Sequence, residues 1–195
     1  MNEETIDLSL FSWLNQPENV DIGADYLEFS TQPETDFWQR THYGVRRNNG
    51  HAYLTHLWDD FSFSIRAEFF YESAYDQCGL LLYLDENNWA RASAVFIDET
   101  YSLLGSVVTS AGYSDWAATA VTPDSNRMFY RVSRRGADFR LDCSRNGDDY
   151  NQMRIFHLHG DLTLARVGIY ACSPGNSSFK VRFNEFAVGP SAWSD

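Results

Sequence analysis

Hydrophobic and polar positions change their pattern twice between residues 75 and 96, and each change marks an expected element. Residues 80–84 form a nearly continuous apolar run, which is typical of a strand whose two faces are both covered. Residues 85–88 (Asp-Glu-Asn-Asn) form a cluster of side chains that bond to their own backbone in turns. Strict alternation follows over residues 89–96, so we expect a second strand there.

The two faces of this second strand differ in chemistry. One face carries Ala90, Ala92, Ala94 and Phe96, and the other carries Trp89, Arg91, Ser93 and Val95. The alanine face suits a core. A face that combines tryptophan with arginine suits a semi-polar binding groove, so we expect Trp89 to be exposed there. We also expect Arg91 to reach an acidic partner such as Asp36 or Asp115, and to be replaceable with little loss of stability.

Further strand patterns fill the rest of the chain. Period-two alternation or β-branched runs occur at residues 61–69, 106–109, 127–134, 137–143, 150–156, 165–173 and 179–188. The pair Asn146-Gly147 predicts a hairpin turn between two of them. Residues 114–116 (Ser-Asp-Trp) lie between strand patterns, where functional side chains often gather. No segment holds a helical period for more than two turns.

The number and spacing of these strands predict an all-β protein, an antiparallel β-sandwich of two sheets. We expect a jelly roll, with an eight-stranded barrel as the alternative. The 195 residues fit a single domain over 1–195 that can bury a core without disulfides. Aromatic residues make up 16% of the chain, which is more than packing alone requires.

Charge and cysteine content narrow the partners and the compartment. A net charge of −12 without a basic tract argues against nucleic acid and against anionic membrane surfaces. We expect no secretory signal at the N-terminus and no membrane span. Three cysteines without metal spacing favour reduced thiols, so we expect a cytoplasmic protein.

Several short sequence segments, in order along the chain, resemble those of one family. They are residues 35–44, 49–51, 75–80, 88–91, 107–109 with 114–116, and 168–174. Together they resemble the family named for a yeast regulator of enolase, a domain of unknown function, from about Trp13 to Val188. The resemblance implies a concanavalin-A-like jelly roll of two sheets, one of them concave, within the lectin and glucanase superfamily. Relatives carry a lysine and then a glutamate where this chain has Arg91 and Val95, which weakens any acid-base role for that strand.

Candidate catalytic and metal groups are weak. The Glu-x-Asp-x-Glu pattern of jelly-roll glucanases is absent, and Asp138 and Asp142 have Arg140 between them, which favours an ion-pair ladder over hydrolysis. His157 and His159 share a strand face but lack a third ligand at a familiar distance. We therefore expect no catalytic residues, no metal and no cofactor.

Aromatic side chains beside planar polar ones are the strongest functional pattern. Sugars present apolar C–H faces and hydroxyl groups, so their sites combine aromatic platforms with polar side chains. The candidate ligand-binding residues are Asp36, Trp38, Tyr43, Gln77, Trp89, Arg91, Asp115, Trp116 and Arg154. For each tryptophan, packing in the core is the competing interpretation.

Three functions remain open. The leading hypothesis is a non-catalytic binding module for a carbohydrate or another polyhydroxyl ligand on the concave sheet. The second is an interaction protein that regulates a metabolic enzyme of the enolase type, because Trp, Tyr and Arg also dominate protein interfaces. The third is a glycoside hydrolase or lyase with atypical carboxylates, for which Asp36, Asp76 and Asp115 are the candidate acids.

Overall fold

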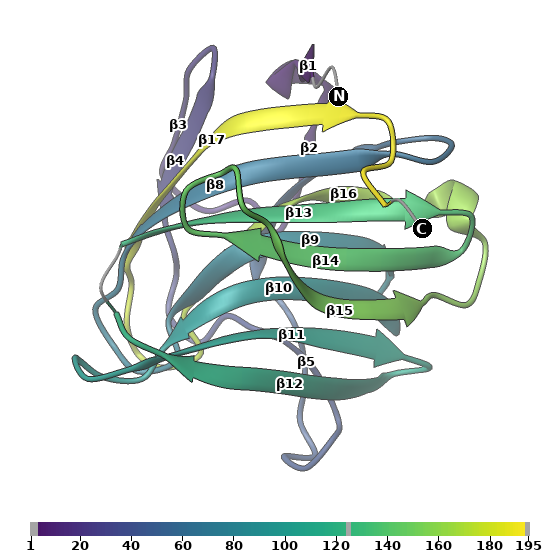
Figure 1. Ribbon diagram of the computed structural model, residues 1–195. Coiled ribbons are helices and arrows are strands. Elements are labelled where there is room, and N and C mark those ends of the chain that lie inside the picture. Colours follow the sequence, from purple (N-terminus) through teal and green to yellow (C-terminus); the bar gives the residue numbers. More distant parts are fainter. Residues whose placement is uncertain (1–3, 124–125, 194–195) are drawn as a thin grey trace.

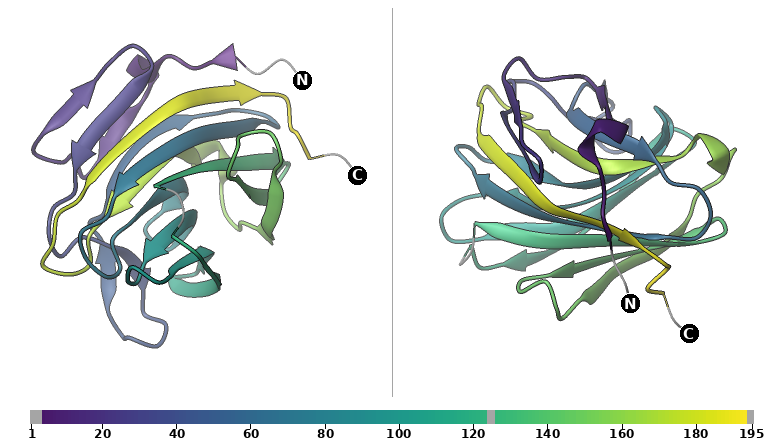
Figure 2. Two further views of the ribbon diagram at one scale, coloured as in Figure 1. Left: turned by 60° about the vertical axis from the view of Figure 1, so that its left-hand side comes forward. Right: turned by 90° about the horizontal axis from the view of Figure 1, so that it is seen from above.

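The computed structural model describes residues 4–123 and 126–193, and two large antiparallel sheets dominate it (Figure 1). The sheets lie over one another and their strands are bent (Figure 2). The all-β, two-sheet jelly-roll sandwich expected from the sequence is confirmed. In the described part of the chain the only helical turns are two short 3₁₀ segments, η1 (Leu8–Leu10) and η2 (Leu162–Leu164).

The first sheet has eight strands. Seven follow the order β15-β14-β13-β8-β17-β4-β3, and β1 pairs with β17. Their bounds are β1 Glu4–Thr5, β3 Val20–Ile22, β4 Tyr26–Ser30, β8 Ser62–Phe70, β13 Arg127–Arg135, β14 Asp138–Ser144, β15 Asn151–His157 and β17 Lys180–Gly189.

The second sheet has seven strands in the order β12-β11-β10-β9-β16-β7-β2. They are β2 Ser12–Leu14, β7 His51–His56, β9 Gln77–Asp85, β10 Asn88–Phe96, β11 Ser102–Ser110, β12 Tyr113–Val121 and β16 Arg166–Cys172. A separate two-stranded ribbon consists of β5 (Phe37–Gln39) and β6 (Arg46–Asn48).

Alternation along the strands builds two cores. The main core lies between the two large sheets and contains Leu80, Leu82, Ala90 and Ala92. The second core contains Leu81 from the outer face of β9, together with Phe37 and Trp38 from the β5–β6 ribbon. The apolar run at residues 80–84 is therefore covered on both faces, as the sequence predicted, and the ribbon provides part of the second cover.

The strand predictions from residue 61 onward are confirmed, with one exception. The Asn146-Gly147 turn joins β14 to β15, and Gly147 has a φ of 87°, the left-handed region that glycine adopts at little cost. The exception is β12, because Ser114, Asp115 and Trp116 belong to this strand and not to a loop between strands. Most of β12 is exposed at the sheet edge, so it lacks the apolar alternation that identifies the other strands.

Candidate ligand-binding pocket

A pocket of about 380 Å³ opens on the outer face of the seven-stranded sheet. The β5–β6 ribbon and its flanks, the strands β9, β10 and β12, and the loops before β9 and after β16 contribute to it. Its lining consists of Asp36, Trp38, Tyr43, Val45, Arg47, Tyr75, Gln77, Arg91, Val95, Trp116 and Pro174. The size is within the range of ligand sites in proteins.

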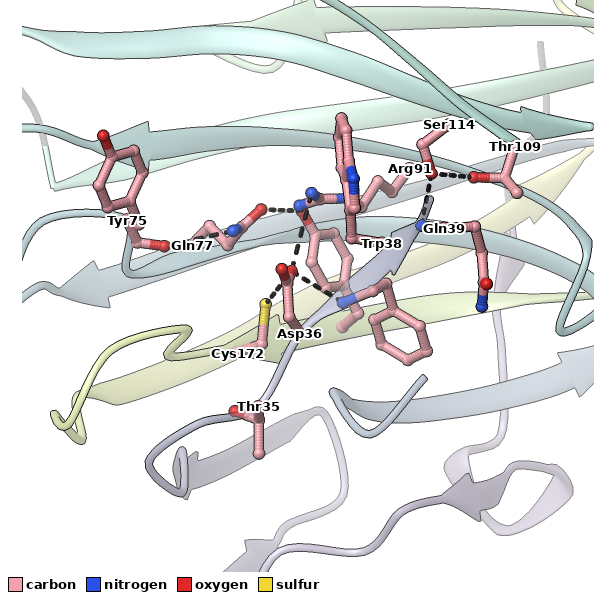
Figure 3. A network of polar contacts seen from close by, with 12 residues as sticks. Thr35, Asp36, Trp38, Gln39, Tyr75, Gln77, Arg91, Thr109, Ser114 and Cys172 are labelled. Atoms are coloured by element: carbon pink, nitrogen blue, oxygen red, sulfur yellow. Dashed lines mark hydrogen bonds and ion pairs between the residues drawn. The ribbon is translucent and has the colours of Figure 1, made fainter. Parts of the chain in front are cut away.

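Hydrogen bonds from residues in and next to the ribbon hold it against the seven-stranded sheet. The backbone N–H of Gln39 donates to Oγ of Ser114 at 2.9 Å, and Ser114 is paired with Thr109 at 2.7 Å (Figure 3). Arg40 donates from Nη1 to the carbonyl of Gly112 at 2.8 Å. Trp38 donates its indole N–H to Thr41 O at 2.9 Å, which closes the hairpin on itself. The ribbon therefore forms a fixed wall of the pocket.

Polar side chains form the floor of the pocket (Figure 3). Arg91 donates from Nη1 to the hydroxyl of Tyr170 at 2.8 Å, and that hydroxyl donates to Oε1 of Gln77 at 3.3 Å. Nη2 of Arg91 lies 3.9 Å from Oδ1 of Asp36, which is an ion pair but too long for a hydrogen bond. The same Oδ1 accepts from the backbone N–H of Phe37 at 2.8 Å.

Three polar atoms of this floor lack a hydrogen-bond partner among the described residues. Nε and Nη2 of Arg91 have no acceptor, and Oδ2 of Asp36 has no donor. Unused donors and an unused acceptor therefore belong to two neighbouring groups, whose nearest atoms, Nη2 and Oδ1, are 3.9 Å apart. A hydroxyl group, which both donates and accepts, can satisfy both.

Burial and neighbouring groups fix the charge states of this floor. Burial works against the charged form of Arg91, but the interactions with Tyr170 and Asp36 outweigh it and raise the pKa of the guanidinium. Burial raises the pKa of the Cys172 thiol, and the nearby Asp36 carboxylate acts in the same direction. Arg91 is thus a permanent cation, and Cys172 is a neutral thiol 3.8 Å from Asp36.

Aromatic side chains surround the mouth. Tyr43 and Tyr75 are 60% and 54% exposed, and Trp116 is 39% exposed. Trp38 is buried and meets Tyr43 edge to face, with ring centroids 5.5 Å apart. The exposed rings offer faces against which apolar C–H groups can pack.

Six of the nine candidate residues come together in this pocket, namely Asp36, Trp38, Tyr43, Gln77, Arg91 and Trp116. Five lining residues were missed by the sequence reasoning, namely Val45, Arg47, Tyr75, Val95 and Pro174. Tyr75 begins the segment at residues 75–80, one of those that carry the family resemblance, and could have been included on that ground. Arg47 has no such pattern around it, because β6 is too short to show alternation.

Trp89 is not exposed in the groove, and this expectation is wrong. It lies on the same face as Arg91, as the alternation indicated, but it is fully buried in the second core. Phe37 of the ribbon packs edge-on against it, with ring centroids 6.0 Å apart. The ribbon covers this part of the sheet, so Trp89 supports the ribbon and cannot stack on a ligand.

Asp115 and Arg154 also lie outside the pocket. Asp115 alternates with Trp116 on β12 and points the other way. Arg154 of β15 donates from Nη2 to Oδ1 of Asp115 at 2.9 Å, so the pair links the edges of the two large sheets. Arg91 therefore meets Asp36 and not Asp115.

The remaining candidate carboxylates have side-chain partners of their own. Asp142 is buried between Arg131 and Arg140, at 3.3 and 2.7 Å, and Asp138 pairs with His157 at 2.7 Å. Within the described chain, no group of three or more His, Cys, Asp or Glu side chains is placed to hold a metal ion. Nor is any helix of residues 4–123 and 126–193 long and apolar enough to cross a membrane.

Fold and pocket together define an all-β sandwich protein with an aromatic-rimmed pocket of ligand size on a sheet face. Residues 13–191 match the family model described as "Protein of unknown function (DUF1349)", and the chain belongs to that family. It is 30% identical over 189 residues to "Regulation of enolase protein 1" of Saccharomyces cerevisiae, covering 96% of this chain and 93% of the relative.

Solved structures show the same architecture. A functionally unknown protein from Saccharomyces cerevisiae superposes with a TM-score of 0.89 at 29% identity, over 96% of this chain and all of the other. A xylan beta-1,4-xylosidase from Bacillus halodurans superposes with a TM-score of 0.60 at 13% identity. The latter match covers 82% of this chain but 33% of the xylosidase, and it shows a shared fold alone.

Proposed function

We propose that this protein is a non-catalytic binding module whose pocket holds a carbohydrate or a related polyhydroxyl ligand. The observation that carries the proposal is the unused donor of Arg91 beside the unused acceptor of Asp36, at the base of an aromatic-rimmed pocket. A ring hydroxyl satisfies both groups, while the ring's C–H face packs on Trp116, Tyr43 or Tyr75.

The carboxylates support binding over hydrolysis. Glycoside hydrolysis uses two carboxyl groups that flank one bond. Asp36 is the one carboxylate among the described lining residues. Asp76 is fully buried, accepts the backbone N–H groups of Glu72 and Ser73 and bonds Ser177, and Asp115 is paired with Arg154. The arrangement therefore offers no acid and base pair across the pocket.

Intrinsic fluorescence tests the proposal, because Trp38 and Trp116 both line the pocket. Titration with a panel of mono- and oligosaccharides should change the emission with saturable dependence for at least one member. In a Trp116→Ala variant that still folds, the remaining emission change should need a higher ligand concentration to saturate. A panel without any binder, confirmed by calorimetry, would overturn the proposal.

A second candidate is a protein that regulates a metabolic enzyme. It is favoured by the name of the 30% identical yeast relative and by the exposed rings of Tyr43, Tyr75 and Trp116, a composition common in interface hot spots. Purified enolase mixed with this protein distinguishes the two. A stoichiometric complex that saturating sugar does not disrupt, and that Trp116→Ala weakens, would favour regulation.

We also propose a reducing, cytoplasmic setting for either function. Cys78, Cys143 and Cys172 are buried free thiols, and burial raises the pKa of each. Such thiols are suited to packing and not to disulfide chemistry.

A further inference from the structure

The charges around the pocket differ from those of the chain as a whole. The protein has 27 acidic and 15 basic residues and a net charge of −12. Residues 36–49, which form the ribbon and its flanks, carry three arginines (Arg40, Arg46 and Arg47) and a single carboxylate, Asp36. The ribbon is thus a basic segment in an acidic protein.

Arg47 is the member of this group that enters the pocket lining. It donates from Nη1 to the carbonyl oxygen of Glu34 at 2.6 Å, and within the described residues no carboxylate lies at ion-pair distance from it. Arg66 and Arg154 differ from it, because Arg66 pairs with Glu68 and Glu185 and Arg154 pairs with Asp115. The charge of Arg47 is therefore held in place by a neutral carbonyl and stays available.

The pocket itself then has an excess of one positive charge. Its described lining contains two cations, Arg47 and Arg91, and one anion, Asp36. Arg91 is 5% exposed, and its contact with Asp36 at 3.9 Å is loose. A cavity with low-dielectric walls and one uncompensated charge attracts a ligand of the opposite sign.

We infer that the ligand of this pocket is an anionic polyhydroxyl compound, a sugar or polyol that carries one carboxylate or phosphate group. This rests on the proposed function and adds the charge of the ligand to it. The hydroxyl groups meet Arg91 and Asp36 on the floor, and the anionic group faces Arg47 at the side. A planar guanidinium matches both carboxylate and phosphate through paired donors.

Matched ligands test the charge separately from the sugar ring. The probes are D-glucose with D-glucuronate and D-glucose 6-phosphate, and D-galactose with D-galacturonate and D-galactose 6-phosphate, titrated by calorimetry. We expect at least one anionic member to bind about tenfold or more tightly than its neutral counterpart. Its affinity should fall as NaCl rises from about 0.05 to about 0.5 M, while that of the neutral sugar stays constant. The anionic probe with the highest affinity identifies whether the natural ligand carries a carboxylate or a phosphate group.

Arg47→Gln should remove this preference, so that the anionic sugar binds no more tightly than its neutral counterpart does to the same variant. Arg46→Gln is the matched control, because Arg46 is the adjacent residue of β6, is exposed and does not line the pocket. It deletes the same charge from the same strand and should preserve most of the preference. Thermal unfolding of both variants verifies that each is folded.

The outcomes separate the two proposals. Equal affinities for neutral and anionic members, both weakened by Trp116→Ala, would overturn the charge inference and leave the polyhydroxyl site standing. Loss of preference in Arg46→Gln to the same degree as in Arg47→Gln would overturn the role of Arg47 in the pocket. Inorganic phosphate binding as tightly as the sugar phosphates, or no binding by any probe, would overturn both proposals.

Discussion

Arg91 and Tyr170 contact each other across strand β9. Nη1 of Arg91 donates to the Tyr170 hydroxyl at 2.8 Å, and the guanidinium lies 5.4 Å from the centre of the tyrosine ring. The two residues belong to β10 and β16, which both pair with β9. Tyr170 is directly opposite Gly79 of β9, a residue without a side chain, so the two long side chains meet over the backbone. This contact orients the floor of the pocket.

Replacing Arg91 should therefore cost stability, contrary to the expectation from the sequence. Arg91 is buried, and its removal leaves Asp36 without a cation and Tyr170 without its donor. We expect Arg91→Met to lower the free energy of unfolding by about 1–3 kcal/mol, the cost of leaving a buried polar group unsatisfied. Urea denaturation measures it. Arg91→Lys keeps the charge but not the fork of donors, so its free energy of unfolding should lie between those of the wild type and Arg91→Met. An Arg91→Met variant as stable as the wild type would contradict the structural role.

Trp89 should be a stability residue without a direct role in binding. Its side chain is fully buried against Phe37, and its indole N–H has no hydrogen-bond partner in the described structure. Trp89→Ala should destabilise the protein by about 3–5 kcal/mol, as expected for removal of a large buried aromatic side chain. Trp89→Phe should cost much less, because it keeps a ring and removes an unpaired buried donor. Chemical denaturation of both variants checks the order; equal losses would mean that the N–H has a partner.

Features that depend on neighbouring residues in the sequence could be predicted, whereas contacts between segments far apart in the sequence could not. Strands after residue 61 alternate cleanly, so their positions and the face of Arg91 followed from local pattern. The burial of Trp89 did not, because the cover comes from Phe37 on a ribbon of three-residue strands that shows no periodicity. Alternation placed Trp89 on the correct face but could not show what lies over that face.

For a related reason, the sequence did not show that Asp115 and Arg154 lie outside the pocket. Residues 113–121 form an exposed edge strand without apolar alternation, so the opposite directions of Asp115 and Trp116 were not apparent. The orientation of Arg154 depends on an irregularity in the pairing of β14 with β15 between Leu141 and Asp142. Such an irregularity shifts which residues share a face, and no local pattern in the sequence marks it.

Breaking the Asp115–Arg154 pair should leave ligand binding intact. The Asp115 side chain is 72% exposed, and exposed ion pairs contribute about 0–1 kcal/mol. Arg154→Ala should therefore change the affinity for any pocket ligand less than about twofold, within that range, and lower thermal stability only slightly. Calorimetric titration of the Arg154→Ala variant, the wild type and an Arg91 variant with the same ligand compares their affinities. A large loss of affinity in Arg154→Ala would return this residue to the site.

Trp116 should contribute to binding more than to stability. It lines the pocket from an edge strand and is 39% exposed, so truncation creates no closed cavity. We expect Trp116→Ala to weaken ligand binding by about 0.5–1.5 kcal/mol, the scale of an aromatic packing contact. Trp58→Ala is the matched control, since Trp58 is 62% exposed, stacks on His56 and is not part of the lining. Equal effects of the two changes would argue against a pocket-specific role.

Stability should fall on mild acidification because of His51. This side chain is 2% exposed; its Nε2 accepts from the backbone N–H of Gln32 at 3.0 Å, and its Nδ1 donates to the carbonyl of Asn15 at 2.8 Å. Accepting at Nε2 requires the neutral ring. Burial lowers the pKa of His51, and the bond to Asn15 only partly opposes this.

The sign follows from proton binding in the two states. With a pKa lower in the folded than in the unfolded protein, the unfolded chain binds more protons below its ordinary value of about 6.5. The contribution of neutral His51 to the free energy of unfolding is therefore complete above pH 6.5. It decreases as the pH falls below this value, and it decreases no further once the pH is below the pKa of His51 in the folded protein. Urea unfolding at pH 7.5, 6.5 and 5.5 should show this decline, measured as a decrease in the unfolding free energy. A His51→Gln variant should show a smaller decline than the wild type. Identical pH profiles for His51→Gln and the wild type would assign the acid sensitivity to other groups.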